Sequence, residues 1–318
     1  MIRIALIGIG DYTEDIIKIL LKIGNIKLSY IFDANYEKAM LFKNKHYKMN
    51  LKATNNLENI ANNSDCVIIN SLMPTKVDII KFFLVKKVNV FAIPPISFNF
   101  VDLLNLKEIA TSNNVFLSDC PFFINSNWFE DAIKLNISNK ILKASFYNNS
   151  QKRDELLSNR GVFDNKYDYN LGRGVLFANG YGIVYSAIFL FGKVDKIKAI
   201  GHKLSNHSVL DFNAIFKHQN NIISTFDVSE QYCSNNKSLI ICENNPFYLI
   251  NYNILEEFNI KYSSRKFTLT IQTNNDIIET FKTYLKNIKN NDRKFFNSLL
   301  NISIETIRCL SLIESEIK

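Results

Sequence analysis

The fold of this chain is decided by its first residues, IRIALIGIGDYT at positions 2–13. Residues 2–7 form a short, mostly apolar run rich in isoleucine, which predicts a strand covered on both faces. Gly8 and Gly10 predict a tight turn after this strand, and the pattern of residues 13–23 predicts a helix. In such a strand–turn–helix unit the helix N-terminus directs backbone N–H groups towards a bound phosphate. The stretch therefore predicts a dinucleotide site.

The turn departs from the usual glycine pattern at its third position, which is Thr13. A small residue normally packs the helix against the strand there, and a threonine is tolerable because it can also cap the helix. Asp11 and Tyr12 lie between the second glycine and this threonine, so we expect them beside the pyrophosphate.

Asp33 ends the second predicted strand, residues 27–32. An acid at about this distance along the chain accepts hydrogen bonds from the adenosine ribose of a bound dinucleotide. Its charge repels a 2′-phosphate, so the sequence favours NAD over NADP. The alternative is that Gly8 and Gly10 only form a strand–helix turn and that Asp33 caps the next helix.

The chain changes character near residue 120. Before it, strands and helices alternate at a spacing that predicts a parallel sheet with helices on both faces. After it, strand-like runs joined by Asn-rich turns predict an antiparallel sheet, and two amphipathic helices at 277–288 and 293–317 end the chain. We therefore expect an α/β protein with a Rossmann domain at 1–120. The remainder, 121–318, is expected to be an α+β domain built on a large, mostly antiparallel open sheet.

The composition argues against several classes of protein. The chain has 318 residues and a formal net charge of +8, but no basic block stands out, so we expect no nucleic-acid partner. The five cysteines are far apart and form no CxxC pair, which favours a reducing cytoplasm and argues against a disulfide framework or a zinc site. The uncharged run at 174–192 carries Asn179 and interior glycines, so we expect a buried helix and no membrane span.

Four segments line up with one family. They are GIGDYT at 8–13, DCVIINSLMPTKVD at 65–78, VNVFAIPPIS at 88–97 and LGRGVLFANGYGIVY at 171–185. Through them the chain resembles the glucose–fructose oxidoreductase and inositol dehydrogenase family (Gfo/Idh/MocA), NAD(P)-dependent enzymes that act mostly on sugars. The resemblance implies a small-molecule substrate and a C-terminal sheet that often forms homo-oligomers.

On the cofactor side the resemblance carries over. Gly8, Gly10 and Asp33 match the family pattern, and Ser71 and Met73 fall where family members line the nicotinamide ribose. The resemblance therefore implies NAD as the cofactor, with these residues around it.

On the catalytic side the chain departs from the family. Pro95 matches the proline of the family's Glu-Lys-Pro motif, so Ile93 and Pro94 stand in place of the glutamate and the lysine. Neither of them can transfer a proton. VNVFAIPPIS thus keeps the turn of the motif and lacks its acid–base group.

The helix expected at 174–191 lacks a second set of family residues. Two aspartates of family members fall on Ala178 and Tyr185, and a histidine falls on Gly182. Positions 178, 182 and 185 are spaced i, i+4 and i+7, so they share one face of a continuous helix. Only the phenol of Tyr185 can exchange a proton there, and an ordinary phenol pKa of ~10 makes it a poor base without a nearby cation.

The candidate acid or base is therefore Tyr185, with Lys76 as its cation, because Lys76 falls at a family histidine position after the third Rossmann strand. The alternative is that Tyr185 only packs and Lys76 is solvated. Asp119 is a further candidate or a turn residue. We assign no metal, because His202 and His207 have no carboxylate at ligand spacing and are expected in a surface loop.

Three arginines are further candidates. Arg153, Arg160 and Arg173 either contact a substrate phosphate or carboxylate or lie in charged loops.

The sequence leaves two functions open. One function is an oxidoreductase with non-standard catalytic residues that acts on a sugar, a nucleotide-linked sugar or another small carbonyl compound. The other is a catalytically inactive descendant that serves as a nucleotide-binding or assembly module.

Overall fold

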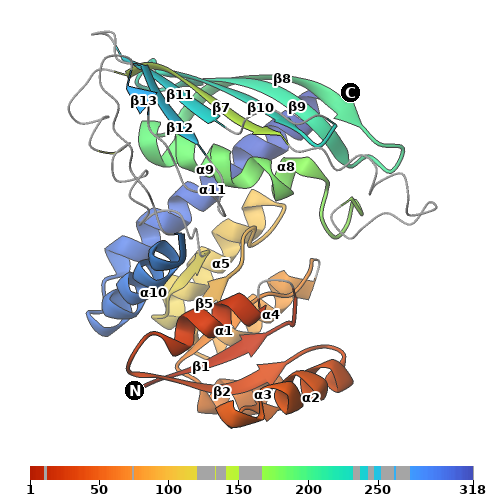
Figure 1. Cartoon of the computed structure of the whole chain (residues 1–318), viewed down its shortest axis with the longest axis vertical. Helices are drawn as coiled ribbons and strands as arrows, with labels where there is room; N and C mark the ends of the chain where they lie inside the picture. Colours follow the sequence, from red (N-terminus) through yellow and green to blue (C-terminus); the bar gives the residue numbers. More distant parts are fainter. Residues whose placement is uncertain are drawn as a thin grey trace. The chain divides into compact units, whose positions relative to one another are not determined.

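A computed structural model describes residues 1–10, 13–73, 75–119, 133, 141–149, 167–231, 237–242, 247–251, 261–262 and 273–317. The chain divides into two compact units, each with its own sheet (Figure 1). The first unit combines Met1–Phe122 with Ile277–Asn301, and the second combines Phe123–Asp276 with Ile302–Lys318.

The first unit is built on a sheet of six parallel strands in the order β3-β2-β1-β4-β5-β6. The strands are β1 (Ile2–Ile7), β2 (Ile26–Phe32), β3 (Lys52–Ala53), β4 (Cys66–Ile69), β5 (Asn89–Ala92) and β6 (Leu117–Asp119). The central strand β4 buries every side chain, as the apolar runs of the sequence predict for a sheet covered on both faces. The predicted parallel Rossmann sheet is confirmed.

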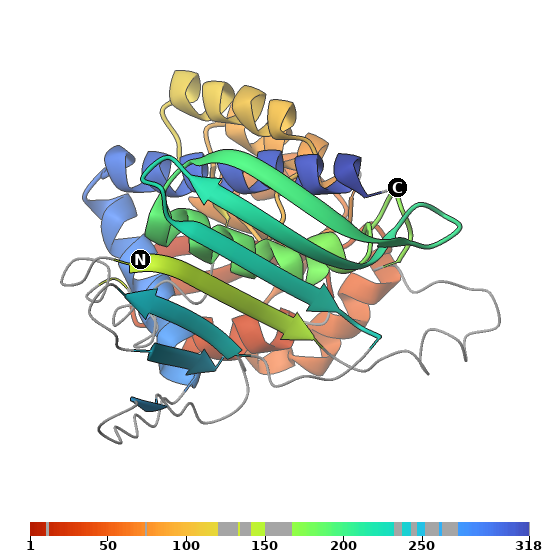
Figure 2. The same cartoon turned by 90° about the horizontal axis from the view of Figure 1, so that it is seen from above.

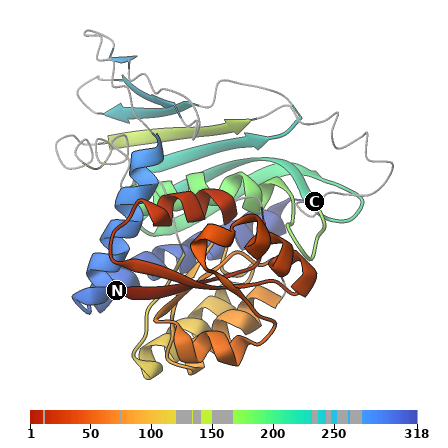
Figure 3. The same cartoon turned by 60° about the horizontal axis from the view of Figure 1, so that its bottom comes forward.

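Five helices connect these strands. They are α1 (Thr13–Leu21), α2 (Tyr36–Lys45), α3 (Leu57–Asn63), α4 (Thr75–Val85) and α5 (Phe100–Asn113), with a short 3₁₀ helix η1 (Tyr47–Met49) after α2. Asparagine side chains cap three of them, because Asn35, Asn56 and Asn99 each accept a backbone N–H of the first turn. Right-handed crossovers put α1 on one face of the sheet and α4 and α5 on the other, as Figure 3 shows.

A segment from the end of the chain completes the first unit. It comprises most of α10 (Thr273–Lys289) and the first turns of α11 (Arg293–Glu316). The ring of Tyr284 stacks on Phe91 of β5 with centroids 5.0 Å apart, and the ring of Phe296 lies 4.5 Å from that of Phe116. The amphipathic pattern predicted these two helices, but such a pattern does not specify the sheet that a helix covers.

The second unit contains a sheet of seven strands in the order β13-β12-β11-β7-β10-β9-β8, seen from above in Figure 2. The strands are β7 (Ile141–Asn149), β8 (Val194–Lys203), β9 (Val209–His218), β10 (Ile223–Ser229), β11 (Lys237–Cys242), β12 (Phe247–Asn251) and β13 (Lys261–Tyr262). All neighbours are antiparallel except β7 and β10, which are parallel. The predicted mostly antiparallel sheet is thus confirmed as a mixed sheet.

The uncharged run forms two helices rather than one, α8 (Val175–Ala178) and α9 (Gly180–Phe191). They separate at Asn179. Ten of the twelve residues of α9 are buried, and the ring of Phe191 lies 6.4 Å from that of Phe146 in β7. None of the helices in the described part of the chain is long and apolar enough to cross a membrane.

Candidate active site

The turn after β1 requires glycine at position 8. Gly8 has a φ of +90°, and a Cβ there would lie 2.7 Å from the carbonyl carbon of Asn70 and 2.8 Å from the nitrogen of Ser71. The Gly8 N–H donates to the oxygen of Phe32, and the Asn70 N–H donates to that of Ile7. The carboxyl ends of β1, β2 and β4 therefore meet at this turn, on the edge of a parallel sheet where ligands bind.

Thr13 closes the turn onto the start of α1. Its hydroxyl accepts hydrogen bonds from the Gly10 N–H at 2.9 Å and from the side-chain amide of Asn70 at 3.2 Å. It also donates to the oxygen of Gly8 at 3.4 Å. Asn70 is a site residue that the sequence analysis missed, because it reaches Thr13 across 57 positions of the chain.

Asp33 lies against the same turn. One carboxylate oxygen accepts the Ile9 N–H at 2.8 Å, and the other accepts the Asn35 N–H at 2.9 Å. The N-cap of α2 is Asn35, so the alternative in which Asp33 caps this helix is wrong. The Lys38 ammonium lies 3.9 Å from Asp33 and donates to the oxygen of Ile9 at 2.5 Å.

The N-terminus of α1 carries two acids whose charges are compensated. Glu14 forms an ion pair with Lys45, and Asp15 forms one with Lys18 at 3.0 Å. The hydrogen bond from Lys45 lowers the pKa of Glu14 below its ordinary value. Because both carboxylates are paired, the helix terminus keeps its attraction for an anionic ligand.

Ser71 and Met73 follow β4. The Ser71 hydroxyl is buried and has no hydrogen-bond partner among the described residues, and Met73 is buried as well. A buried hydroxyl without a partner is uncommon, and a polar ligand atom would satisfy it. Asp11 and Tyr12, predicted beside the pyrophosphate, lie outside the described residues.

Lys76 is buried rather than solvated. Its exposed fraction is 6%, and its ammonium donates to the backbone oxygens of Ile93 at 3.0 Å and Pro95 at 3.1 Å. Burial lowers the pKa of Lys76 to about 8. The amine therefore reaches from α4 to the turn after β5, where Pro94 replaces the family's lysine and the Pro94–Pro95 peptide is cis.

Tyr185 belongs to the second unit and has no exposed surface. Its ring centroid lies 6.0 Å from that of Tyr181 in the same helix. Gly182 is also in α9, but Ala178 belongs to α8. The single continuous helix expected across 178–185 is therefore interrupted at Asn179, while the shared face of positions 178, 182 and 185 stays a prediction.

A buried carboxylate that the sequence analysis missed lies beside this break. Glu230 is 1% exposed and accepts hydrogen bonds from the hydroxyl of Tyr167 and from the side-chain amide of Asn179. The backbone oxygen of Asn179 accepts from the side chain of Asn148 at 2.8 Å. These partners hold the break in place, because a carboxylate is rarely buried unless it is hydrogen-bonded. The four residues of this cluster come from separate segments of the chain, so no short sequence motif identifies them.

His202 does have a carboxylate partner, contrary to the sequence expectation. It lies in β8 rather than in a loop, and its Nδ1 is 2.9 Å from Asp211 of β9. His207 lies in the turn between these strands. Within the described ranges, no three His, Cys, Asp or Glu side chains come together in a way that could hold a metal ion.

The remaining candidates are distributed over both units. Asp119 is fully buried at the end of β6. Arg173 forms an ion pair with Glu314 at 2.9 Å inside the second unit, which gives it a structural partner. Arg153 and Arg160 lie outside the described residues.

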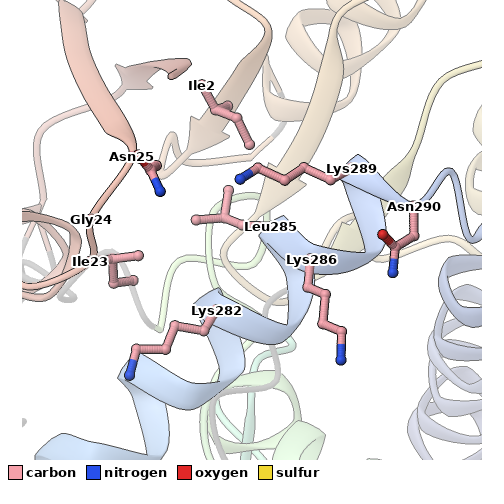
Figure 4. Close-up of a pocket in the computed structure, with 9 residues that line it drawn as sticks. All are labelled: Ile2, Ile23, Gly24, Asn25, Lys282, Leu285, Lys286, Lys289 and Asn290. Carbon is pink, nitrogen blue, oxygen red and sulfur yellow. The ribbon is translucent and has the colours of Figure 1, made fainter.

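A cavity of about 240 Å³ lies at the opposite edge of the Rossmann sheet. Figure 4 shows it between the amino ends of β1 and β2 and helix α10. Its walls include Ile2, Asn25, Leu285 and Lys289. Because Gly8 and Asp33 lie at the carboxyl ends of these strands, this cavity is separate from the predicted cofactor site.

The first domain has a family match. Residues 2–119 match the GFO_IDH_MocA family, an oxidoreductase family with an NAD-binding Rossmann fold. The resemblance inferred from the motifs is thus confirmed for the first domain. No curated protein matches the chain significantly.

Solved structures share the fold over the whole chain. The 3-ketoreductase KijD10 from Actinomadura kijaniata, in complex with NADP and TDP-benzene, matches with a TM-score of 0.83 at 13% identity, over 100% of this chain and 98% of that one. UDP-N-acetylglucosamine 3-dehydrogenase GnnA from Acidithiobacillus ferrooxidans matches with 0.81 at 12%, over 99% and 97%. Biliverdin reductase from Synechocystis, in complex with biliverdin and NADP⁺, matches with 0.78 at 12%, over 99% of each chain.

The residues of the first domain fit a nicotinamide dinucleotide. Gly8 allows the close approach of backbone that a pyrophosphate site requires, and Asp33 directly follows β2. The hydroxyl of Ser71 at the same edge has no partner among the described residues. Gly8, Asp33 and Ser71 therefore lie at the carboxyl ends of β1, β2 and β4, respectively.

Proposed function

We propose that this protein is an NAD(P)-dependent oxidoreductase that acts on the carbonyl or alcohol group of a sugar, a nucleotide-linked sugar or a related small molecule. The observation that carries the proposal is the turn at Gly8, which packs against Asn70 and Ser71 and is braced by Asp33. It occurs in a domain of an NAD-binding oxidoreductase family. A nicotinamide cofactor, when bound, would supply or accept the hydride.

The chain's own residues would hold and orient the cofactor. Gly8 and Gly10 let the turn approach the pyrophosphate, and Asp33 accepts from the adenosine ribose. Ser71 offers a hydroxyl to the nicotinamide ribose, and Met73 lines the same part of the site. The unsatisfied Ser71 hydroxyl supports this placement.

Tyr185 is the candidate proton donor and Lys76 the candidate cation. Pro94, Ala178 and Gly182 have no titratable group, so these two residues are what the corresponding segments retain. Reduction is the less demanding direction. The carbonyl carbon receives a hydride, and the proton for the oxygen can come from the phenol or from water, so the lost lysine is not needed as a base. The pKa of about 8 for Lys76 supports a charge that responds to pH near neutrality.

A chemical guide to the substrate comes from two proteins that share the fold, a 3-ketoreductase in complex with TDP-benzene and a UDP-N-acetylglucosamine 3-dehydrogenase. The test is a screen of keto and hydroxy forms of sugars, nucleotide-linked sugars and small carbonyl compounds. The change in nicotinamide absorbance measures turnover. Turnover with any of them supports the proposal. Cofactor binding with no turnover across sugars, nucleotide-linked sugars and small carbonyl compounds contradicts it.

The second candidate function is a nucleotide-binding module without catalysis. It is favoured by the loss of the acid–base positions at 93, 94, 178 and 182 and by the complete burial of Tyr185. It predicts that the protein binds NADH tightly and that no variant at Tyr185 or Lys76 changes any reaction rate.

We also propose a homo-oligomer that forms through the outer face of the second sheet. Ile200, Ile215 and Ile223 are 73%, 55% and 41% exposed. The strand registers put all three on one face, the one opposite to buried Phe216. Exposed isoleucines in adjacent strands are typical of a surface that a partner covers.

The buried free thiols of Cys66 and Cys309 support a reducing compartment such as the cytoplasm.

A further inference from the structure

The cavity between α10 and the amino ends of β1 and β2 is lined by positive charge only. Three lysines of α10 line it, Lys282, Lys286 and Lys289, and none of the described residues around it is acidic. All three lysines are exposed. Lys282 pairs with Glu279 at 2.7 Å, whereas Lys286 and Lys289 have no ion pair with any described residue. Two ammonium groups at this cavity therefore remain for an anion.

The spacing of these lysines places their charges close together. Positions 282, 286 and 289 are spaced i, i+4 and i+7, so the three ammonium groups leave one face of α10 and repel one another. The helix dipole favours cations in the last turn, which accounts for the positions of Lys286 and Lys289 but not for the cavity beside them. A bound anion would relieve the repulsion.

Part of the cavity wall is apolar. Leu285 and Ile23 are 6% and 7% exposed, and Ile2 is half-buried. The side chain of Lys289 extends past Leu285 towards Ile2 and Asn25 (Figure 4). An apolar cavity of about 150 Å³ holds benzene, so the volume of about 240 Å³ leaves room for a ring of that size and a small polar group. The wall therefore favours an anion with an apolar part over a bare ion.

Two side-chain amides add further donors. Asn25 and Asn290 both line the cavity, and neither side chain forms a hydrogen bond with any described residue. An amide N–H of each is thus available to an oxygen of a ligand. The cavity combines an apolar surface with uncompensated ammonium groups and free amide donors, which is the chemistry that binds an amphipathic anion.

We propose that this cavity binds a phosphate monoester that carries a small apolar group. Such an ester has roughly two negative charges and three acceptor oxygens near neutral pH, which match the two unpaired ammonium groups and the amide donors. Lysine binds phosphate as a mobile point charge, and the apolar group packs against Ile23 and Leu285. The site goes beyond the proposed function, because none of its residues belongs to the predicted cofactor site.

The test measures the binding of phenyl phosphate to the full chain by isothermal titration calorimetry, for the wild type, Lys289→Met and Lys48→Met. Lys48 is an exposed lysine of η1, so its variant loses the same charge away from the cavity. We expect Lys289→Met to weaken binding about tenfold, the size of one charge-assisted hydrogen bond. Lys48→Met should bind as the wild type does, and Lys289→Arg should retain most of the affinity. No binding by the wild type, or equal binding by Lys289→Met, overturns the proposal.

Titrations with other anions define the ligand class. Inorganic phosphate lacks the apolar group and should bind the wild type about tenfold more weakly than phenyl phosphate. Benzoate keeps the ring but has a single charge, so it should also bind more weakly. If either anion binds as tightly as phenyl phosphate, the assignment of an apolar phosphate ester is wrong.

A competition experiment separates this cavity from the cofactor site. Saturating NADH should leave the affinity for phenyl phosphate unchanged, and displacement by NADH would overturn the proposal by placing the probe in the cofactor site. The comparison of Lys289→Met with the wild type needs no cofactor. Its result therefore stands even if NADH does not bind and the proposed function fails.

Discussion

The ammonium of Lys76 donates a hydrogen bond of 3.0 Å to the backbone oxygen of Ile93, directly before the two prolines that follow strand β5. A second bond of 3.1 Å reaches Pro95. A lysine from one helix thus supports the turn from which the sequence has lost the family's own lysine. The ammonium of Lys76 is thus held inside the first unit by two backbone carbonyl dipoles.

The first prediction concerns the pH dependence of stability. The pKa of Lys76 is lowered by burial to about 8 from an ordinary value of 10.5. The unfolded chain binds this proton more tightly, so the wild type gains stability as pH rises from about 8 to about 10.5, by at most about 3 kcal/mol. Lys76→Met should lack this gain. Urea unfolding of both proteins across that window measures it, and parallel pH profiles would contradict the buried charge.

The second prediction concerns Tyr185. If its phenol donates the proton, Tyr185→Phe lowers turnover on a carbonyl substrate by roughly 10²-fold or more while NADH affinity stays unchanged. Tyr181→Phe is the matched control, because Tyr181 is a buried tyrosine one turn earlier in the same helix. Steady-state rates and cofactor titrations separate the effects. Normal turnover in Tyr185→Phe removes the residue from the mechanism.

The third prediction concerns the glycine turn. Gly8→Ala places a Cβ 2.7 Å from the carbonyl carbon of Asn70 at a φ of +90°, so we expect a loss of roughly 2–4 kcal/mol in the free energy of unfolding. Gly24→Ala is the control, because a Cβ there meets no atom within 4 Å and no left-handed backbone is involved. Urea unfolding compares the two, and equal stabilities would show that the turn can relax.

The fourth prediction concerns assembly. Ile215→Glu puts a charge among the exposed isoleucines of the second sheet, so the homo-oligomer should dissociate to monomers. Leu41→Glu changes an exposed leucine of α2 in the first unit and should leave the assembly intact. Light scattering after size exclusion reports the mass of each. A monomeric wild type would end the proposal of an oligomer.

Much of the nucleotide site was predictable because its signals are local. The strand, the glycines and the first helix form one continuous stretch, and Thr13 closes the turn onto Gly8 and Gly10 within it. Asp33 is recognisable because it follows the second strand, which pairs with the first, at the distance along the chain expected of a ribose-binding acid. Asn70 was not, because its side chain reaches Thr13 from another strand.

The catalytic region was less predictable, for reasons that specific residues show. The continuous helix expected across 178–185 breaks at Asn179, which is held by Glu230 from the end of β10 and by Asn148 from β7. Periodicity alone extends a helix through an apolar run, since it carries no information about a distant acceptor. His202 likewise acquired its partner Asp211 through strand pairing.

The sequence by itself determined the Rossmann sheet, the change of architecture near residue 120 and the glycine turn, because each follows from the spacing of neighbouring residues. The tertiary structure alone decided that Lys76 is buried against Ile93 and Pro95, that Lys38 lies beside Asp33 and that Tyr284 returns to cover Phe91. Burial and charge pairing depend on groups that are far apart along the chain. They are fixed only when the fold brings those groups together.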